Sequence, residues 1–418
     1  MWVVAGFLSL CLGFVYAELG TLMPRSGGDF TYIKKVFGNW PAFLAVWTLP
    51  LFVQTASTAV LGLVFADYLL PLVMPACAAP QIIRRLIAAI HILTIGISNA
   101  FSPRIGVYVQ IISMVTKVLA LVIIVVTGAV NLGQSTNENF SAPFQDSSSD
   151  PTSYGLAMFA CLFAYAGYQR IGEIADEVKD SNKNIPIGIL LSIVLVTILY
   201  VLVNVSYFIL LPKTEFLASA AVAYSWAQKA FPSVAVLIPI VVLISVYGAN
   251  NGGCFAASRI MFAAARAGHY PEMISFLHIE TQAPVVSIIL YQALSLVMLI
   301  PGDIMSLINF MGFVQSFIVL TSSLALLRLK YIRRGQKVEG FTSPIVFPII
   351  AILGTLLLIL APFLTTPRIE FLYGAAFAAG GYILYIPFVH FGIKLPGIDK
   401  ATTFFQLLCN GCPTEKVD

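Results

Sequence analysis

Charged side chains are scarce in this sequence of 418 residues: Asp, Glu, Lys and Arg make up 10% of it, whereas about 25% is usual for a soluble domain. Long polar linkers are lacking too, and 59% of the residues are hydrophobic, with a mean hydropathy of +0.92. A soluble protein of this length would split into several domains joined by polar linkers. The composition therefore excludes a soluble globular protein and places most of the chain in a lipid bilayer.

Signatures of enzymes and of nucleic-acid binding are lacking as well. No Walker loop, GxSxG or HExxH motif occurs, and the His residues are scattered. The formal charge is only +4 and the basic residues stand without interleaved aromatics, so nucleic acid is excluded as a partner. Cys409 and Cys412 have Cys-x-x-Cys spacing but no second pair, which disfavours zinc and leaves palmitoylation as an alternative. We predict no enzymatic activity, no cofactor and no metal site.

Long apolar runs, in contrast, are abundant. They are about 20 residues long, the length of a transmembrane helix, and do not show the ten-residue alternation of a β-barrel. Eleven spans are predicted, at 1–19, 41–70, 86–101, 105–131, 153–177, 186–211, 233–262, 283–300, 304–328, 344–364 and 371–392. The sequence thus predicts an all-α integral membrane protein in the lipid bilayer, with one transmembrane domain at 1–392 and a C-terminal tail at 393–418.

The basic residues predict the orientation, because loops rich in Lys and Arg stay in the cytoplasm. If the first span runs inward, 16 of the 23 Lys and Arg residues lie on the cytoplasmic side and five on the outer side. The C-terminus is then cytoplasmic. A cleaved signal peptide over 1–19 is the alternative, but no basic segment precedes it and Glu18 with Gly20 makes a poor cleavage site. A preceding helix, absent from this sequence, explains the orientation better.

Two spans are interrupted by small and polar residues. The first contains the run Phe163-Ala164-Tyr165-Ala166-Gly167-Tyr168-Gln169-Arg170. Such a run can unwind and free carbonyls for a substrate ammonium, because irregular backbone at membrane depth survives only beside a cavity. Close helix packing through the small residues is the alternative, and the spacing alone does not decide between them.

The second interruption is Ser245-Val246-Tyr247-Gly248-Ala249-Asn250-Asn251-Gly252-Gly253. Gly permits close helix crossing, and a buried Asn must find a hydrogen-bond partner. We interpret this run as a tight packing face with interhelical hydrogen bonds, which could also support an unwound neighbour.

Lys117 stands alone within an apolar run, and an isolated cation inside the membrane is a functional hypothesis by default. Snorkelling toward the cytoplasmic interface is the alternative. The nearest basic residue on that side, Arg104, is 13 residues away, which is about 20 Å along a helix and argues against snorkelling.

Two residues of the predicted outer loops are candidate sites of covalent modification. Cys77 is the only cysteine placed outside the membrane on the outer face, and an unpaired cysteine there suggests an intermolecular disulfide. Asn139-Phe140-Ser141 is an N-glycosylation sequon in a loop without Lys or Arg. Asn139 is therefore a candidate glycosylation site.

Several motifs together resemble one known family. In chain order they are Ala17-Glu18-Leu19-Gly20, Pro24-Arg25-Ser26-Gly27-Gly28-Asp29-Phe30, Pro75-Ala76-Cys77, Phe163 to Tyr168 with Glu177 and Asn184-Ile185-Pro186, Ala257-Ser258-Arg259 with Arg266-Ala267-Gly268-His269, and Leu307-Ile308-Asn309-Phe310. They resemble the light chains of heteromeric amino-acid transporters, the L-type group of the amino acid–polyamine–organocation superfamily. The resemblance covers essentially the whole chain.

The resemblance implies a LeuT-like fold of twelve helices with an inverted five-plus-five repeat, whose first and sixth family helices are unwound. It also implies sodium-independent exchange of amino acids at the plasma membrane. The partner would be a single-span glycoprotein heavy chain, attached through Cys77.

The resemblance also assigns substrate-binding roles by position. Phe163 matches the aromatic gate over the bound amino acid, and Ala166 and Gly167 match the small residues beside it. Tyr168 stands where better-known members carry Trp, and Gln169 where they carry Asn.

Two further positions match functional residues of the family. Gln315 lies where some members have a pocket Asn. Lys117 matches the lysine that fills the place of a sodium ion in related symporters.

One departure is large. The family's first helix, with its Gly-Ser-Gly segment for the substrate carboxylate, does not occur in the sequence, and residue 1 falls at the start of the family's second helix. We interpret the sequence as an N-terminally shortened isoform or an incomplete gene model, with eleven helices and weak amino-acid binding. The alternative function is a transport-inactive subunit that pairs with a heavy chain or regulates full-length transporters.

Overall fold

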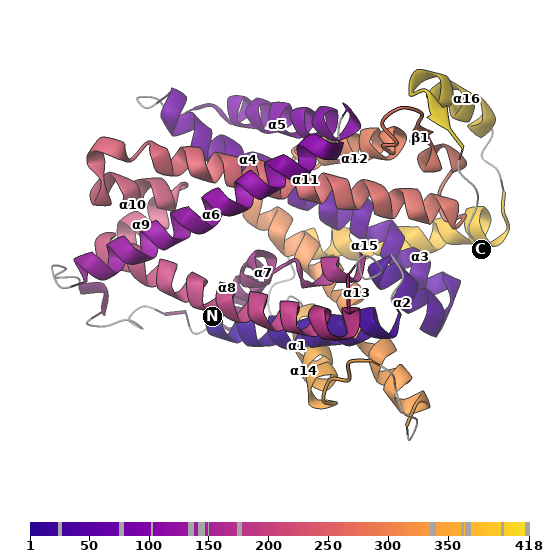
Figure 1. The fold of residues 1–418 in the computed structure, drawn as a ribbon, viewed down its shortest axis with the longest axis horizontal. Helices are drawn as coiled ribbons and strands as arrows, with labels where there is room; N and C mark the ends of the chain where they lie inside the picture. The colour runs from indigo at the N-terminus through magenta and orange to yellow at the C-terminus, as the bar shows by residue number, and fades with distance from the viewer. Residues whose placement is uncertain are drawn as a thin grey trace.

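The computed structural model describes residues 1–23, 27–74, 79–101, 103–132, 138–140, 147–148, 150–173, 178–334, 340–360, 363, 369–393 and 397–413. It is an assembly of helices, most of which run along the long axis of the molecule (Figure 1). The helices are α1 (Trp2–Leu22), α2 (Gly28–Phe37), α3 (Asn39–Thr48), α4 (Gln54–Val73), α5 (Gln81–Phe101), α6 (Pro103–Asn131), α7 (Pro151–Ala164), α8 (Ser181–Leu210), α9 (Lys213–Ala218), α10 (Val222–Ala230), α11 (Leu237–Arg266), α12 (Val285–Val297), α13 (Ile304–Ile332), α14 (Val346–Leu360), α15 (Ile369–Leu384) and α16 (Ile398–Leu408).

Short elements connect or extend these helices. Two are π-helical, η1 (Leu49–Val53) between α3 and α4 and η7 (Tyr385–His390) after α15. Four are 3₁₀ turns, η2 (Glu138–Phe140), η3 (Tyr168–Glu173), η4 (Pro232–Val234) and η5 (Glu272–Ser275). The strands β1 (Leu277–His278) and β2 (Gly411–Cys412) pair antiparallel, with Leu277 opposite Cys412.

The predicted all-α membrane architecture is confirmed. Eight of the described helical segments are long and apolar enough to cross a membrane, and three shorter apolar helices lie at 153–164, 285–297 and 346–360. Each of the eleven predicted spans therefore contains an apolar helix. The span at 153–177 is not one continuous helix, however, because α7 ends at Ala164.

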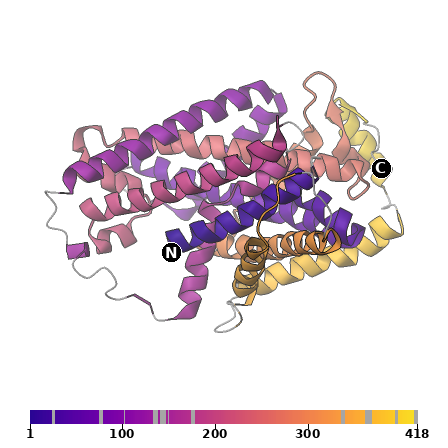
Figure 2. The same cartoon turned by 60° about the horizontal axis from the view of Figure 1, so that its bottom comes forward.

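The helix α1 is central in the assembly, whereas α6 is peripheral. In α1, 72% of the most apolar 18-residue window is buried inside the protein, compared with 11% for the corresponding window of α6. Small residues let α1 approach α8 closely: a Cβ on Gly6 would lie 2.5 Å from Thr197 Oγ1, and one on Gly13 would lie 2.6 Å from Ile189 Cγ2. The largest core cluster joins α1 to η1, α4, α7, α13 and α14, and both α7 and η3 pack against α1. Figure 2 shows α1, in indigo, running from the end marked N into the assembly of helices.

Candidate substrate site at the broken helix

The backbone leaves the helical path at the end of α7. The Ala166 amide donates to the Phe163 carbonyl at 3.2 Å, and the Gly167 amide donates to Gln169 Oε1 at 3.1 Å. Gly167 has φ of +139°, a conformation that side chains disfavour, so glycine suits this position. The predicted interruption is therefore present, and it separates α7 from η3.

Side chains satisfy part of the backbone that this break exposes. Tyr200 on α8 donates its hydroxyl to the Ala164 carbonyl at 2.7 Å, in addition to the Gln169 contact with Gly167. Among the described residues, no amide donates to the Leu162 carbonyl, because Ala166 has turned to Phe163. A carbonyl left in this state can accept from an ammonium group.

A cavity with a volume of about 50 Å³ lies beside the break. It is lined by Leu12, Phe159, Leu162, Phe163, Tyr168, Gln169, Ile308, Met311, Gly312, Gln315, Ser316, Val319, Thr355 and Leu358. Four predicted substrate residues, Phe163, Tyr168, Gln169 and Gln315, thus meet at one cavity although α13 is far from η3 in sequence. Ala166 and Gly167 are exposed at the break and are not among the lining residues.

None of the described lining residues is Asp, Glu, Lys or Arg. The polar groups are the phenol of Tyr168, the amides of Gln169 and Gln315, and the hydroxyls of Ser316 and Thr355. An apolar cavity with a few convergent polar groups is the usual form of a small-molecule site.

Lys117 is half-buried on α6, between exposed apolar residues such as Val118 and Leu119. No hydrogen bond or ion pair joins it to another residue in the part of the chain that the structure describes. Its role in replacing a sodium ion stays a prediction.

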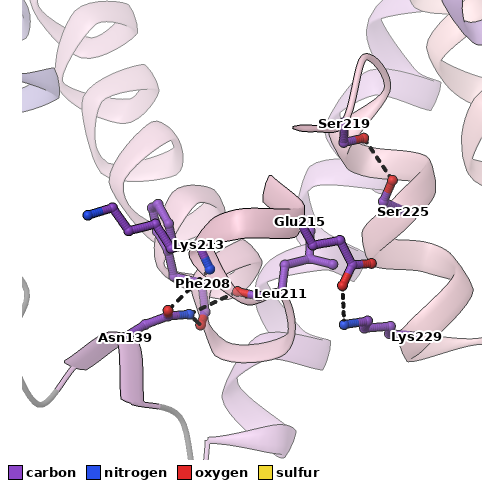
Figure 3. Close-up of polar contacts among 8 residues, drawn as sticks. All are labelled: Asn139, Phe208, Leu211, Lys213, Glu215, Ser219, Ser225 and Lys229. Carbon is purple, nitrogen blue, oxygen red and sulfur yellow. Dashed lines mark hydrogen bonds and ion pairs between the residues drawn. The ribbon is translucent and has the colours of Figure 1, made fainter. Parts of the chain in front are cut away.

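Asn139 lies in η2 and is held by the end of α8 (Figure 3). Its Nδ2 group donates to the carbonyls of Phe208 and Leu211, both at 2.9 Å. Its Oδ1 accepts from the amide of Lys213 at 3.3 Å. In this arrangement the nitrogen that a glycan would modify is already bonded twice, and glycosylation of Asn139 stays an untested prediction. Cys77 lies outside the described residues.

The second interrupted run, 245–253, is part of the continuous helix α11. A Cβ on Gly248 would lie 2.2 Å from the Ser113 side chain of α6, so glycine permits a close crossing. Asn251 accepts from Asn99 at 2.8 Å and donates to the Gly106 carbonyl at 3.2 Å. The predicted packing face with interhelical hydrogen bonds is confirmed.

Sequence reasoning missed a buried carboxylate near the broken helix. Asp29 Oδ1 accepts from the Tyr16 hydroxyl of α1 and the Ser322 hydroxyl of α13, each at 2.6 Å. The Tyr16 ring lies 5.7 Å from the Tyr168 ring of η3. Asp29 therefore links α2 to the elements that line the cavity. Its place in the family motif was the only sequence signal.

A second missed group is Glu18, which is 1% exposed on α1. Its Oε1 lies 2.7 Å from Lys330 Nζ at the end of α13. Its Oε2 accepts from the amide and hydroxyl of Ser343 at 2.9 and 2.6 Å. A carboxylate inside an apolar span was the signal that could have found this network.

Comparison with known proteins agrees with this architecture. The amino acid permease family matches residues 1–386. The chain is 33% identical over its whole length to the b(0,+)-type amino acid transporter 1 of Mus musculus and covers 86% of that protein. It is 37% identical to the cystine/glutamate transporter of Homo sapiens, over 79% of this chain and 66% of the relative.

A third relative is the large neutral amino acids transporter small subunit 2 of Homo sapiens, 35% identical over 75% of this chain and 59% of the relative. All three relatives are transporters rather than enzymes. Together with the multi-pass helical fold, these matches confirm the resemblance to light chains of heteromeric amino-acid transporters, and the chain belongs to the amino acid permease family.

Proposed function

We propose that the protein is a sodium-independent amino-acid exchanger that binds its substrate beside the break between α7 and η3. The observation that carries this proposal is the meeting of Phe163, Tyr168, Gln169 and Gln315 at one cavity next to irregular backbone. The ammonium of a bound amino acid would bond to carbonyls near Phe163 and Ala166. Phe163 would cover the substrate, and rocking of the helices would expose the site to either side.

The lining favours a neutral substrate side chain. A buried charge needs a partner, and the described lining offers no ionised side chain to a cationic or acidic substrate. Leu162, Met311 and Val319 offer apolar contact, and Gln315 can hydrogen-bond a polar substrate. We therefore expect transport of neutral amino acids such as leucine or glutamine in preference to arginine or glutamate.

The other parts of the proposal concern assembly and location. The protein would act as the light chain of a heterodimer at the plasma membrane, joined to a single-span heavy chain through Cys77, with its C-terminus in the cytoplasm. Lys117 would take the place of a sodium ion and brace the broken helix. A transport-inactive subunit is the alternative, but the relatives, which carry the names of transporters, do not favour it.

Counterflow in proteoliposomes tests this function. Vesicles that contain the protein are loaded with unlabelled leucine and given labelled leucine, arginine or glutamate outside, with and without sodium. We expect uptake of leucine that requires internal amino acid and does not require sodium. Uptake that continues into empty vesicles, or that stops without sodium, would contradict exchange as proposed.

A matched pair of variants tests the location of the site. Tyr168→Ala removes a ring from the cavity, and Tyr373→Ala removes one that is 60% exposed on α15. Loss of a buried aromatic contact costs about 1.5–3 kcal/mol, so Tyr168→Ala should weaken substrate affinity about tenfold or more. Tyr373→Ala should leave affinity unchanged. If the two substitutions changed substrate affinity equally, the substrate would bind elsewhere.

A further inference from the structure

The helix α16 has an apolar side that no described element covers. Phe404, Leu407 and Leu408 are 59%, 74% and 62% exposed. With about 100° between consecutive residues of a helix, these three positions fall on one stripe. Single exposed apolar residues are common on proteins, but a contiguous stripe at helical spacing marks an interaction surface.

The opposite side of α16 is already occupied by the protein. Ile398, Ala401 and Phe405 are half-buried there, and the helix packs against η5. Just beyond α16, β2 pairs with β1, and Ile279 donates its amide to the Asn410 carbonyl at 3.2 Å. These contacts hold α16 at one end of the helical assembly, beside β1 (Figure 1). The stripe therefore has a fixed orientation and faces away from its own protein.

The stripe is close in sequence to exposed apolar residues at the end of the last apolar span. The last transmembrane segment ends with η7, where Ile386 is 51% exposed, and Phe391 and Ile393 just after it are 68% and 56% exposed. Only a short connection separates these residues from Ile398, the first residue of α16. Exposed apolar residues thus follow one another from the membrane span into α16.

The charge around the stripe suits an anionic membrane surface. Lys400 is exposed on α16, four residues before Phe404. In the sequence, Lys394 lies between the last span and α16, His390 is the last residue of η7, and Asp399 is the only acid from 390 to 408. A helix with an exposed apolar stripe and a Lys on the same side suits the plane of the membrane interface, because the long Lys side chain can extend its ammonium to anionic headgroups while the apolar side chains are buried.

We propose that α16 lies in the membrane interface, with Phe404, Leu407 and Leu408 at the boundary between headgroups and acyl chains of an anionic leaflet. Asp399 and Thr403 would face water; the Thr403 hydroxyl already donates to the Asp399 carbonyl at 3.0 Å. Because β2 and η5 contact α16, this membrane contact would also hold β1 and η5 near the membrane surface. The proposal depends on the chain spanning a membrane and not on which solute it carries.

Fluorescent labelling of two neighbouring positions tests this proposal. Phe404→Cys and Thr403→Cys, each made in a Cys412→Ser background, are labelled with the environment-sensitive dye NBD and reconstituted into vesicles. Cys409 is buried, and burial raises the pKa of its thiol, so it should react poorly. The Cys412→Ser parent, labelled in parallel, gives the signal from the remaining thiols.

We expect NBD at position 404 to emit at shorter wavelength than at position 403 and to lose fluorescence when lipids carry a shallow spin label. The quenching should increase with the fraction of phosphatidylserine, and Lys400→Ala should weaken that increase. Aqueous emission from both positions would overturn the proposal. Shielding at 404 without quenching by lipid would show that a protein covers the stripe, which also overturns it. Gel filtration shows that each variant is folded and monodisperse.

Discussion

Replacement of Glu18 by Gln should strongly destabilise the protein, although the two side chains have the same shape. Glu18 is 1% exposed, and its two oxygens accept from Lys330 on one side and from Ser343 on the other. A Gln side chain has one oxygen and one NH₂ group. It must therefore place a donor against either the Lys330 ammonium or the Ser343 amide. Both choices break the network.

The expected magnitude follows from the burial of the pair. Lys330 is 15% exposed, and it also donates to the Ser343 carbonyl at 2.6 Å, so it cannot turn to water without losing that bond. Removing one partner of a buried ion pair costs about 3–5 kcal/mol. Because Lys330 retains some contact with solvent, we expect a loss of about 3 kcal/mol in the free energy of unfolding for Glu18→Gln.

The assay is chemical denaturation of purified protein in mixed micelles, with a double-mutant cycle. Lys330→Gln should also be destabilising, because it leaves the Glu18 carboxylate buried and unpaired. The double variant should recover about 1–3 kcal/mol relative to the sum of the single losses, since it removes both charges. Additive losses in the cycle would refute the pairing of Glu18 with Lys330.

An exposed ion pair of the same chain provides the control. Lys229 Nζ lies 2.5 Å from Glu215 Oε2, and the two side chains are 37% and 41% exposed (Figure 3). Exposed ion pairs contribute about 0–1 kcal/mol because water and salt screen them. Glu215→Gln should therefore change the free energy of unfolding by less than about 1 kcal/mol. A loss as large as that of Glu18→Gln would show that burial does not govern the effect.

Three further predictions use other parts of the molecule. Cys77→Ser should abolish a high-mass, reductant-sensitive band on non-reducing gels of cells that express the protein, and persistence of that band would exclude Cys77 as the linking residue. Lys117→Ala should leave the protein folded by gel filtration but sharply reduce sodium-free leucine exchange, whereas unchanged exchange would identify Lys117 as a snorkelling residue. Gly248→Ala should lower the thermal unfolding midpoint, because its Cβ would overlap Ser113, while Gly253→Ala, with no atom within 4 Å of its Cβ, should not lower it.

Most of the fold could be predicted because the bilayer restricts the choices. Runs of about 20 apolar residues must form helices in hydrocarbon, so hydropathy alone located the spans. Hydropathy did not find α2, α9, α10 or α16, which are only 6 to 11 residues long. Their stability comes from packing against other elements, which no local pattern reveals. The pairing of β1 with β2 was equally hidden, because the strands are far apart in the chain.

The candidate site was predictable where the signal was local. Phe163 to Gln169 form one contiguous run, and its small residues indicated either a break or a close packing face, between which the spacing alone did not decide. Gln315 came only from the family resemblance, because nothing near it in sequence points to α7. Asp29 and Glu18 were missed as network residues, since their partners Ser322 and Lys330 are about 300 residues away. A single sequence can mark such a carboxylate as costly but cannot name the group that pairs with it.

The contrast between α7 and α11 explains why only one of two Gly-rich runs is broken. In α11 the Asn side chains form hydrogen bonds to neighbouring helices, and the absence of a side chain at Gly248 leaves room for Ser113. The backbone of α11 therefore remains a continuous helix. In α7 the break is stabilised from outside, by the Tyr200 hydroxyl on Ala164 and the Gln169 amide on Gly167. A helix can open inside a membrane protein only where such partners, or a ligand, meet the freed groups. The Leu162 carbonyl meets no amide of the described residues, and Leu162 lines the cavity. In the proposed function, this carbonyl is one that the substrate ammonium would meet.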